Sequence, residues 1–149
     1  MSSDAHCPGD VVVIGIGNPF RRDDGVGVAV AARLSAQRLP GVRFAVSDGE
    51  AAGLIELWEG ARLAVVIDAL CTEPSTPGRI HRRSVGDARD TDFGEAVELA
   101  RILGRLPRRL VLFAVEAKDM GFGPGLTPAV AAAAGRVAAE IANQVAIAA

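Results

Sequence analysis

Residues 11–16 read VVVIGI, a short continuous apolar run, and lead into a glycine-containing loop, GNPFRRDDG, at residues 17–25. Such a run is typical of a strand that is buried on both faces, as strands in the middle of a parallel sheet are. Residues 25–39 then place apolar side chains at helical spacing, and Pro40 and Gly41 stop the pattern. The stretch therefore predicts a central strand followed by a helix.

The alternation of strands and helices continues along the chain. Further strands are expected over residues 42–47, 63–68 and 109–115, with a short, charge-decorated edge strand over 79–84. Further helices are expected over residues 51–59, 93–103 and 127–147. This order predicts one α/β domain over residues 1–149, a three-layer α/β/α fold with a mostly parallel sheet of about five strands and one antiparallel edge strand.

Composition excludes several classes of function. The 149 residues carry 16 basic and 18 acidic side chains, interspersed along the chain, which gives no basic field for a nucleic-acid partner. The apolar runs are far shorter than the roughly 20 residues that a bilayer span needs, so no membrane partner is expected. Residues 1–10 lack the pattern of a secretory signal, and we expect them to form a disordered tail on a cytoplasmic protein.

Acidic residues stand at every predicted strand exit. In a parallel sheet, ligands bind at the edge where the strands end at their carboxyl termini. The residues at these exits are Gly17, Asn18, Asp23 and Asp24 after the first strand, Asp48, Gly49 and Glu50 after the second, Asp68 at the third, and Glu116 and Asp119 after the last. Carboxylates from separate strands can converge on one cation, while glycines let a backbone approach. This pattern indicates a cation-binding edge.

A dinucleotide-binding loop is the obvious alternative, because a strand, the glycine pair Gly15 and Gly17, and a helix are all present. Phe20 occupies the position of the third glycine, however, and Asp23 and Asp24 stand where a pyrophosphate needs positive potential. Negative charge at that place would repel phosphate. The nucleotide-binding reading therefore rests on the glycine pair alone.

Simpler roles exist for several of these residues. One of Asp23 and Asp24 is expected to be the helix N-cap, because aspartate is favoured there by geometry and by the helix dipole. Asp68 is either a solvated strand terminus or a functional carboxylate. We expect His81 to be solvated among its arginine neighbours, and Cys71 to be an inert, packed free thiol.

Four segments resemble the nickel-iron hydrogenase maturation proteases. Residues 15–27, GIGNPFRRDDGVG, look like the opening signature of that family, and residues 66–69, VIDA, look like its second motif. Residues 48–53, DGEAAG, resemble the family's DGGTxG loop, which is associated with substrate selectivity, with Glu50 in place of the second glycine. Residues 116–128 are similar to the stretch before the last helix, so that the resemblance extends from residue 11 to about residue 141.

The resemblance implies an endopeptidase that removes the C-terminal extension of a nickel-iron hydrogenase large-subunit precursor after nickel insertion. The family usually contacts metal through three positions, and the motifs place two of them, which are also the expected catalytic groups, on Asp24 and Asp68. The third is a histidine before the helix near residue 93, where this chain has none. An ungapped match puts Arg89 there and a three-residue deletion puts Asp92 there. We prefer Asp92 as the third metal ligand, because arginine cannot ligate a cation.

The expected substrate-binding residues lie in the two glycine loops, namely Gly17, Asn18, Asp48, Gly49 and Glu50, with residues 119–125 flanking the same edge. The expected cofactor is a divalent metal, nickel carried by the precursor, and no ion need reside in the free enzyme. Carboxylates are hard ligands, so the precursor's cysteine thiolates would supply the selectivity for nickel. The ion would polarise the scissile carbonyl or activate a water. A rival from another class is a non-catalytic binding module that docks a metalloprotein precursor, supported by the missing histidine.

Overall fold

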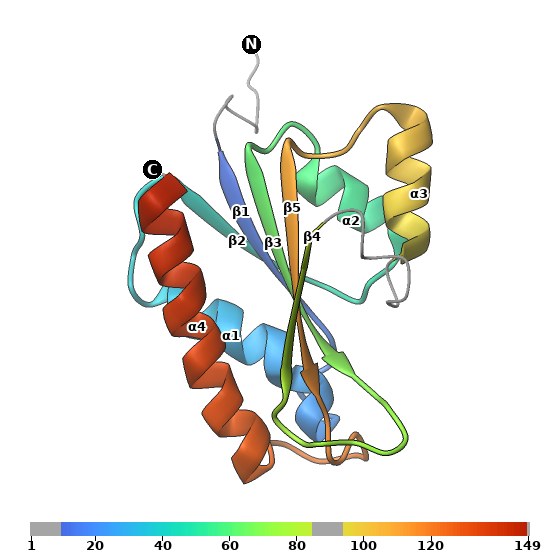
Figure 1. The fold of residues 1–149 in the computed structure, drawn as a ribbon, viewed down its shortest axis with the longest axis vertical. Coiled ribbons are helices and arrows are strands. Elements are labelled where there is room, and N and C mark those ends of the chain that lie inside the picture. Colours follow the sequence, from blue (N-terminus) through green and yellow to red (C-terminus); the bar gives the residue numbers. More distant parts are fainter. Residues whose placement is uncertain (1–9, 85–93, 149) are drawn as a thin grey trace.

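The computed structural model describes residues 10–84 and 94–148. A five-stranded sheet forms the centre of the molecule (Figure 1). Its strands are β1 (Val11–Ile16), β2 (Val42–Ser47), β3 (Leu63–Leu70), β4 (Ile80–Ser84) and β5 (Arg109–Glu116). The helices are η1 (Arg22–Gly25, a 3₁₀ turn), α1 (Val26–Ser35), α2 (Ala51–Trp58), α3 (Gly94–Leu103) and α4 (Pro128–Ala148).

The strands lie in the order β2-β1-β3-β5-β4. The pairs β1–β2, β1–β3 and β3–β5 are parallel, and β4 is antiparallel to β5 at one edge. The predicted architecture is therefore confirmed, including the interior place of β1 and the edge place of β4. Because the four parallel strands all point the same way, their carboxyl ends meet at one edge of the sheet.

Two apolar layers cover the sheet. Alternate residues of β1 point to opposite faces, so Val11 and Val13 pack with α1 and α4, whereas Val12 and Ile14 pack with α2 and α3. Figure 1 shows the same division, with α1 and α4 on one side of the sheet and α2 and α3 on the other. Burial on both faces explains why β1, β3 and β5 read as continuous apolar runs rather than alternating ones.

The structure differs from the sequence prediction mainly after β1. The helix expected from residue 25 is preceded by the η1 turn and ends at Ser35, because residues 36–38 form hydrogen-bonded turns. Strand β3 continues two residues beyond Asp68, since its pairing with β5 extends to Leu70 and Glu116. Residues 1–9 of the expected tail lie outside the described part. None of the helices in the described part combines the length and the apolar character that crossing a membrane requires.

Candidate functional site

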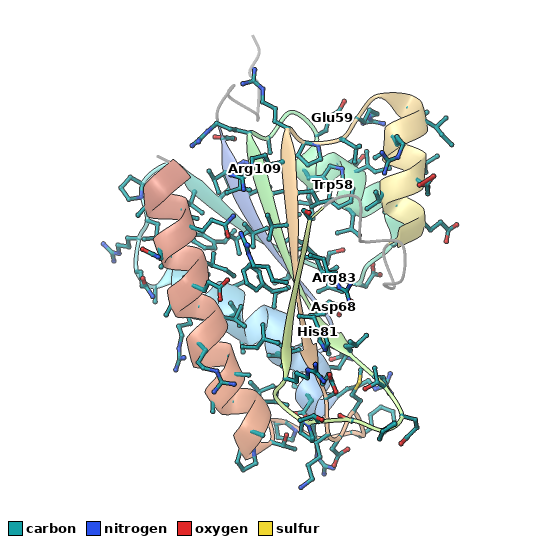
Figure 2. The ribbon with its side chains drawn as sticks, viewed as in Figure 1. Trp58, Glu59, Asp68, His81, Arg83 and Arg109 are labelled. Atoms are coloured by element: carbon teal, nitrogen blue, oxygen red, sulfur yellow. The ribbon has the colours of Figure 1, made fainter. Side chains whose placement is uncertain are left out.

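A cavity of about 240 Å³ opens at the carboxyl end of the parallel strands. Its lining, which we call the acidic cavity, consists of Ile16, Gly17, Asn18, Asp24, Asp48, Gly49 and Asp68. Three carboxylates from three different strand exits therefore share one opening. Six of the seven lining residues are ones that the sequence marked at the strand exits. Figure 2 shows Asp68 toward the carboxyl end of β3.

The loop after β1 fixes the position of Asp24. The backbone N–H of Asn18 donates to Asp24 Oδ2 at 2.9 Å, and the amide of Asp24 donates to the carbonyl of Arg21 at 3.0 Å. Gly17 adopts φ +132°, and a Cβ at this position would lie 1.8 Å from the carbonyl oxygen of Asp24. Only glycine therefore allows the aspartate backbone to lie this close to the end of β1.

Asp23 has a different role from its neighbour. Its side chain is fully buried and accepts hydrogen bonds from the backbone N–H groups of Lys118, Asp119 and Thr127 at 2.8–3.0 Å, and from the Thr127 hydroxyl. Burial alone would raise the pKa of Asp23, but the hydrogen bonds from these three residues outweigh it and lower the pKa. Asp23 thus fastens the loop after β1 to the segment before α4.

The prediction that Asp23 or Asp24 caps the first helix is wrong. Gly25 is the N-cap of α1, and no side chain caps either η1 or α1. Both aspartates lie within the 3₁₀ turn η1, and Asp24 directly precedes the N-cap Gly25. The Asp23 carboxylate is consequently available for its contacts with residues 118–127, and the Asp24 carboxylate for the nearby Asn18 amide.

Asp68 is not a solvated strand terminus. Its side chain is 6% exposed, and it lies inside β3, opposite Ala114 of β5. Its Oδ1 accepts a hydrogen bond from the backbone N–H of Ala69 at 2.8 Å. Because Asp68 is nearly buried and lines the cavity, its carboxylate is accessible to a ligand that enters the cavity. This is the setting in which a carboxylate contacts a ligand strongly.

The loop after β2 divides its residues between the cavity and α2. Asp48 and Gly49 line the acidic cavity, and Asp48 Oδ1 accepts the backbone N–H of Glu50 at 2.9 Å. The Glu50 carboxylate turns to the helix, where it accepts the N–H groups of Ala52 and Gly53 at 3.0 and 3.2 Å. Glu50 is thus the N-cap of α2 and is not among the residues that line the cavity.

Residues 119–125 pack against the loop after β1 and do not contribute to the lining of the acidic cavity. Asp119 forms an ion pair with Arg22 at 2.6 Å, and the backbone N–H of Arg22 donates to the carbonyl of Gly123 at 2.9 Å. The Gly121 amide and then the Arg22 guanidinium lower the pKa of Asp119. The segment does not line the cavity, but its contacts with Arg22 stabilise the loop that carries Asp24.

A second polar cluster was not predicted. Glu116 is 5% exposed and accepts hydrogen bonds from the Thr76 amide at 2.8 Å and the Thr72 hydroxyl at 3.3 Å, with His81 Nε2 2.7 Å from its Oε2. The Thr76 amide and then His81 lower the pKa of Glu116. The expectation that His81 is solvated is therefore wrong. The pair depends on the antiparallel register that places Ile80 and His81 opposite Val115 and Ala114 at the end of β5, and the sequence alone does not give that register.

The third expected metal ligand cannot be placed among the described residues, and the thiol of Cys71 is not packed. Asp92 and the alternative Arg89 lie outside the described residues. Within residues 10–84 and 94–148, no group of three histidine, cysteine or acidic side chains could hold a metal ion. Cys71 is a free cysteine, but it is exposed, so the expectation of a packed thiol is wrong.

Comparison with known proteins identifies the fold. No protein-family model matches the chain, and no curated protein is significantly similar to it. Among solved structures, the hydrogenase maturating endopeptidase HybD from Escherichia coli superposes with a TM-score of 0.77 and 18% identity over 89% of both chains. The hydrogenase 2 maturation peptidase from a Thaumarchaeota archaeon has a TM-score of 0.70 and 24% identity, over 91% of this chain and 97% of that one.

The [NiFe] hydrogenase maturation protease HybD from Thermococcus kodakarensis has a TM-score of 0.69 and 21% identity, over 91% of this chain and 98% of that one. The similarity thus covers nearly the full length of each protein. The chain has the fold of the hydrogenase maturation endopeptidases.

Proposed function

We propose that this protein is an endopeptidase that removes the C-terminal extension of a nickel-iron hydrogenase large-subunit precursor, with Asp24 and Asp68 as the catalytic, metal-contacting groups. The observation that carries the proposal is the meeting of these two carboxylates in one cavity at the carboxyl end of the sheet. The fold, shared with such endopeptidases over about nine-tenths of the chain, supports the same reading.

The carboxylates and the glycines of the cavity have different roles in this proposal. Asp24 and Asp68 present carboxylate oxygens that accept hydrogen bonds and attract a cation. Gly49, at positive φ, leaves its part of the wall without a side chain so that a peptide backbone can come close, whereas Gly17 lets the backbone of Asp24 lie next to the end of β1. Nickel enters as part of the precursor, whose thiolates complete its coordination. An ion bound there would polarise the carbonyl of the bond to be cut.

The precursor as partner and the cytoplasm as the place of the reaction belong to the same proposal. Nothing among the described residues favours the rival binding module, and the position of the missing histidine, on which that module rested, lies outside them. The nucleotide-binding reading loses its one argument. A Cβ at Gly15 would lie 2.3 Å from the Gly27 carbonyl oxygen, so this glycine serves close packing of strand and helix. Gly17 likewise faces Asp24 rather than open space.

The test is processing of nickel-loaded large-subunit precursors by Asp24→Asn and Asp68→Asn. Each variant should lower the rate at least about a hundredfold, the scale for loss of a group that acts on the reacting atoms. Asparagine keeps an acceptor oxygen, so the Asn18 contact survives in the first variant. Glu140→Gln, an exposed acid on α4, is the matched control and should process normally. Normal processing by both cavity variants overturns the assignment.

A further inference from the structure

The two edges of the sheet are protected very differently. Strand β4 closes one edge with the sequence IHRRS, and Figure 2 shows His81 and Arg83 on it. Strand β2 forms the other edge, as Figure 1 shows, with the sequence VRFAVS. Its one charged residue, Arg43, forms an ion pair with Asp10, with 2.8 Å between Nε and Oδ2. Natural proteins usually guard an edge with outward charges, proline or a bulge. In the described part of the chain, the β2 edge has no such guard.

The main chain of β2 offers a regular set of open hydrogen-bonding groups. The amides of Val11 and Gly17 donate to the carbonyls of Gly41 and Ser47, which places the odd-numbered residues of β2 toward β1. In a parallel pair, the alternate residues then point their N–H and C=O groups away. These residues are Val42, Phe44 and Val46, and the described part of the chain places no strand beside them.

An apolar groove accompanies this edge. A cavity of about 310 Å³, which we call the β2 groove, is lined by Val28, Ala31, Ala32 and Ser35 of α1 and by Phe44, Ala45 and Val46 of β2. Val46 is 61% exposed although it is a large apolar residue in a strand. A strand added beside β2 would place every second side chain over this groove.

The edge leads directly into the acidic cavity. Ser47 ends β2, and the next two residues, Asp48 and Gly49, line that cavity together with Asp24 and Asp68. A chain lying along β2 therefore reaches, at the end of the strand, the residues that line this cavity. This continuity identifies the occupant as the peptide on which the cavity acts.

We infer that the extension of the precursor binds as an added strand along the open edge of β2, with alternate side chains in the β2 groove. The inference rests on the proposed function. The extension begins at the bond to be cut, which lies over Asp24 and Asp68, and continues away from the cavity from Val46 toward Val42. It therefore runs antiparallel to β2, and the six residues of the strand pair with about 20 Å of extended peptide.

Val46→Pro tests this arrangement. Proline removes the outward N–H of residue 46 and no bond to β1, and proline is tolerated on edge strands. We expect KM for a nickel-loaded precursor to rise about tenfold with kcat within twofold. Ser84→Pro is the matched control, since the β4–β5 register also points its N–H outward, and its KM should match that of the wild type. Equal KM values for both variants overturn the inference.

Hydrogen exchange gives a second readout that does not depend on a proline variant. Precursor bound to Asp24→Asn should slow exchange of the Val42, Phe44 and Val46 amides, while that of the β4 amides is unchanged. Slowing elsewhere, with β2 unaffected, overturns the inference. The inference is also overturned if these amides are protected in the free chain and lose that protection on dilution. A second copy of the chain would then be the strand that pairs with β2. Wild-type enzyme that cuts precursor without protection at β2 refutes strand addition alone, whereas failure to cut any precursor refutes the proposed function as well.

Discussion

Replacement of Asp23 by asparagine should damage the protein in a way that replacement of Asp24 does not. Asparagine keeps one acceptor oxygen for Thr127, but its NH₂ group then faces the N–H groups of Lys118 and Asp119, which lie 2.9 and 3.0 Å from the present Oδ2. Two hydrogen bonds to a charged acceptor are lost, at about 1.5–3 kcal/mol each. The expected loss is about 3–6 kcal/mol, a large part of the roughly 5–15 kcal/mol that stabilises a typical domain.

Urea unfolding provides the assay, because the single tryptophan, Trp58, is fully buried and reports the loss of the core. Asp24→Asn should change the free energy of unfolding by less than about 1 kcal/mol, because the hydrogen bond from the Asn18 amide can persist. Thr127→Val removes only the hydroxyl donor and should cost about 1 kcal/mol, which keeps the test usable if the asparagine variant at position 23 does not fold.

The difference between wild type and Asp23→Asn should also depend on pH. The folded pKa of Asp23 lies below its ordinary value of 3.8, so its ionised form stabilises the fold. That contribution is complete above pH 3.8 and is lost as the pH falls through the folded pKa. Asparagine does not titrate there, and the two unfolding curves should converge in acid. A loss below 1 kcal/mol at neutral pH, or an equal loss for Asp24→Asn, refutes the reasoning.

Three further changes probe other parts of the site. Gly17→Ala should cost at least about 2 kcal/mol in urea unfolding, because of its close approach to a backbone oxygen, whereas Gly41→Ala, also at positive φ but with open space around it, should cost about 1 kcal/mol. Glu116→Gln should accelerate hydrogen exchange of the Thr76 amide, and in the wild type the same acceleration should appear as acid takes the pH below 4.5 through the lowered pKa. Glu50→Ala should cost about 1 kcal/mol as a lost helix cap, and an unchanged stability would show that its contacts to α2 contribute nothing.

The sheet and its site edge were predictable because they depend on pattern. Fully buried strands such as β1 carry continuous apolar runs, and the rule for parallel sheets then gathers Asp24, Asp48 and Asp68 at one edge. The turn chemistry was not predictable in the same way. Two adjacent aspartates before a helix look like caps. The structure instead places them in the η1 turn, where Asp23 is buried and bonds to residues about a hundred positions later in the chain.

The partners that a side chain finds on a neighbouring strand were also not predictable from the sequence. The pairing of His81 with Glu116 depends on an antiparallel register, and a stretch with three basic residues in a row gives no hint of it. Glu50 was read as a change in the substrate loop, but its position directly before an apolar helix also suits a cap, and the structure shows the carboxylate in that role. Local sequence does not decide between two uses of one carboxylate.

The contacts of Asp23 determine when, during folding, the loop after β1 can take its final position. Its partners lie 95, 96 and 104 positions later in the chain. During synthesis, β1 and its loop emerge first, yet the loop has nothing to be fastened to until Thr127 has left the ribosome. A nascent chain that ends before residue 118 can pair its early strands, but it lacks all three backbone donors and leaves the Asp23 carboxylate without them. We therefore expect the acidic cavity, whose wall includes Asp24 of this loop, to be among the last parts of the molecule to assemble.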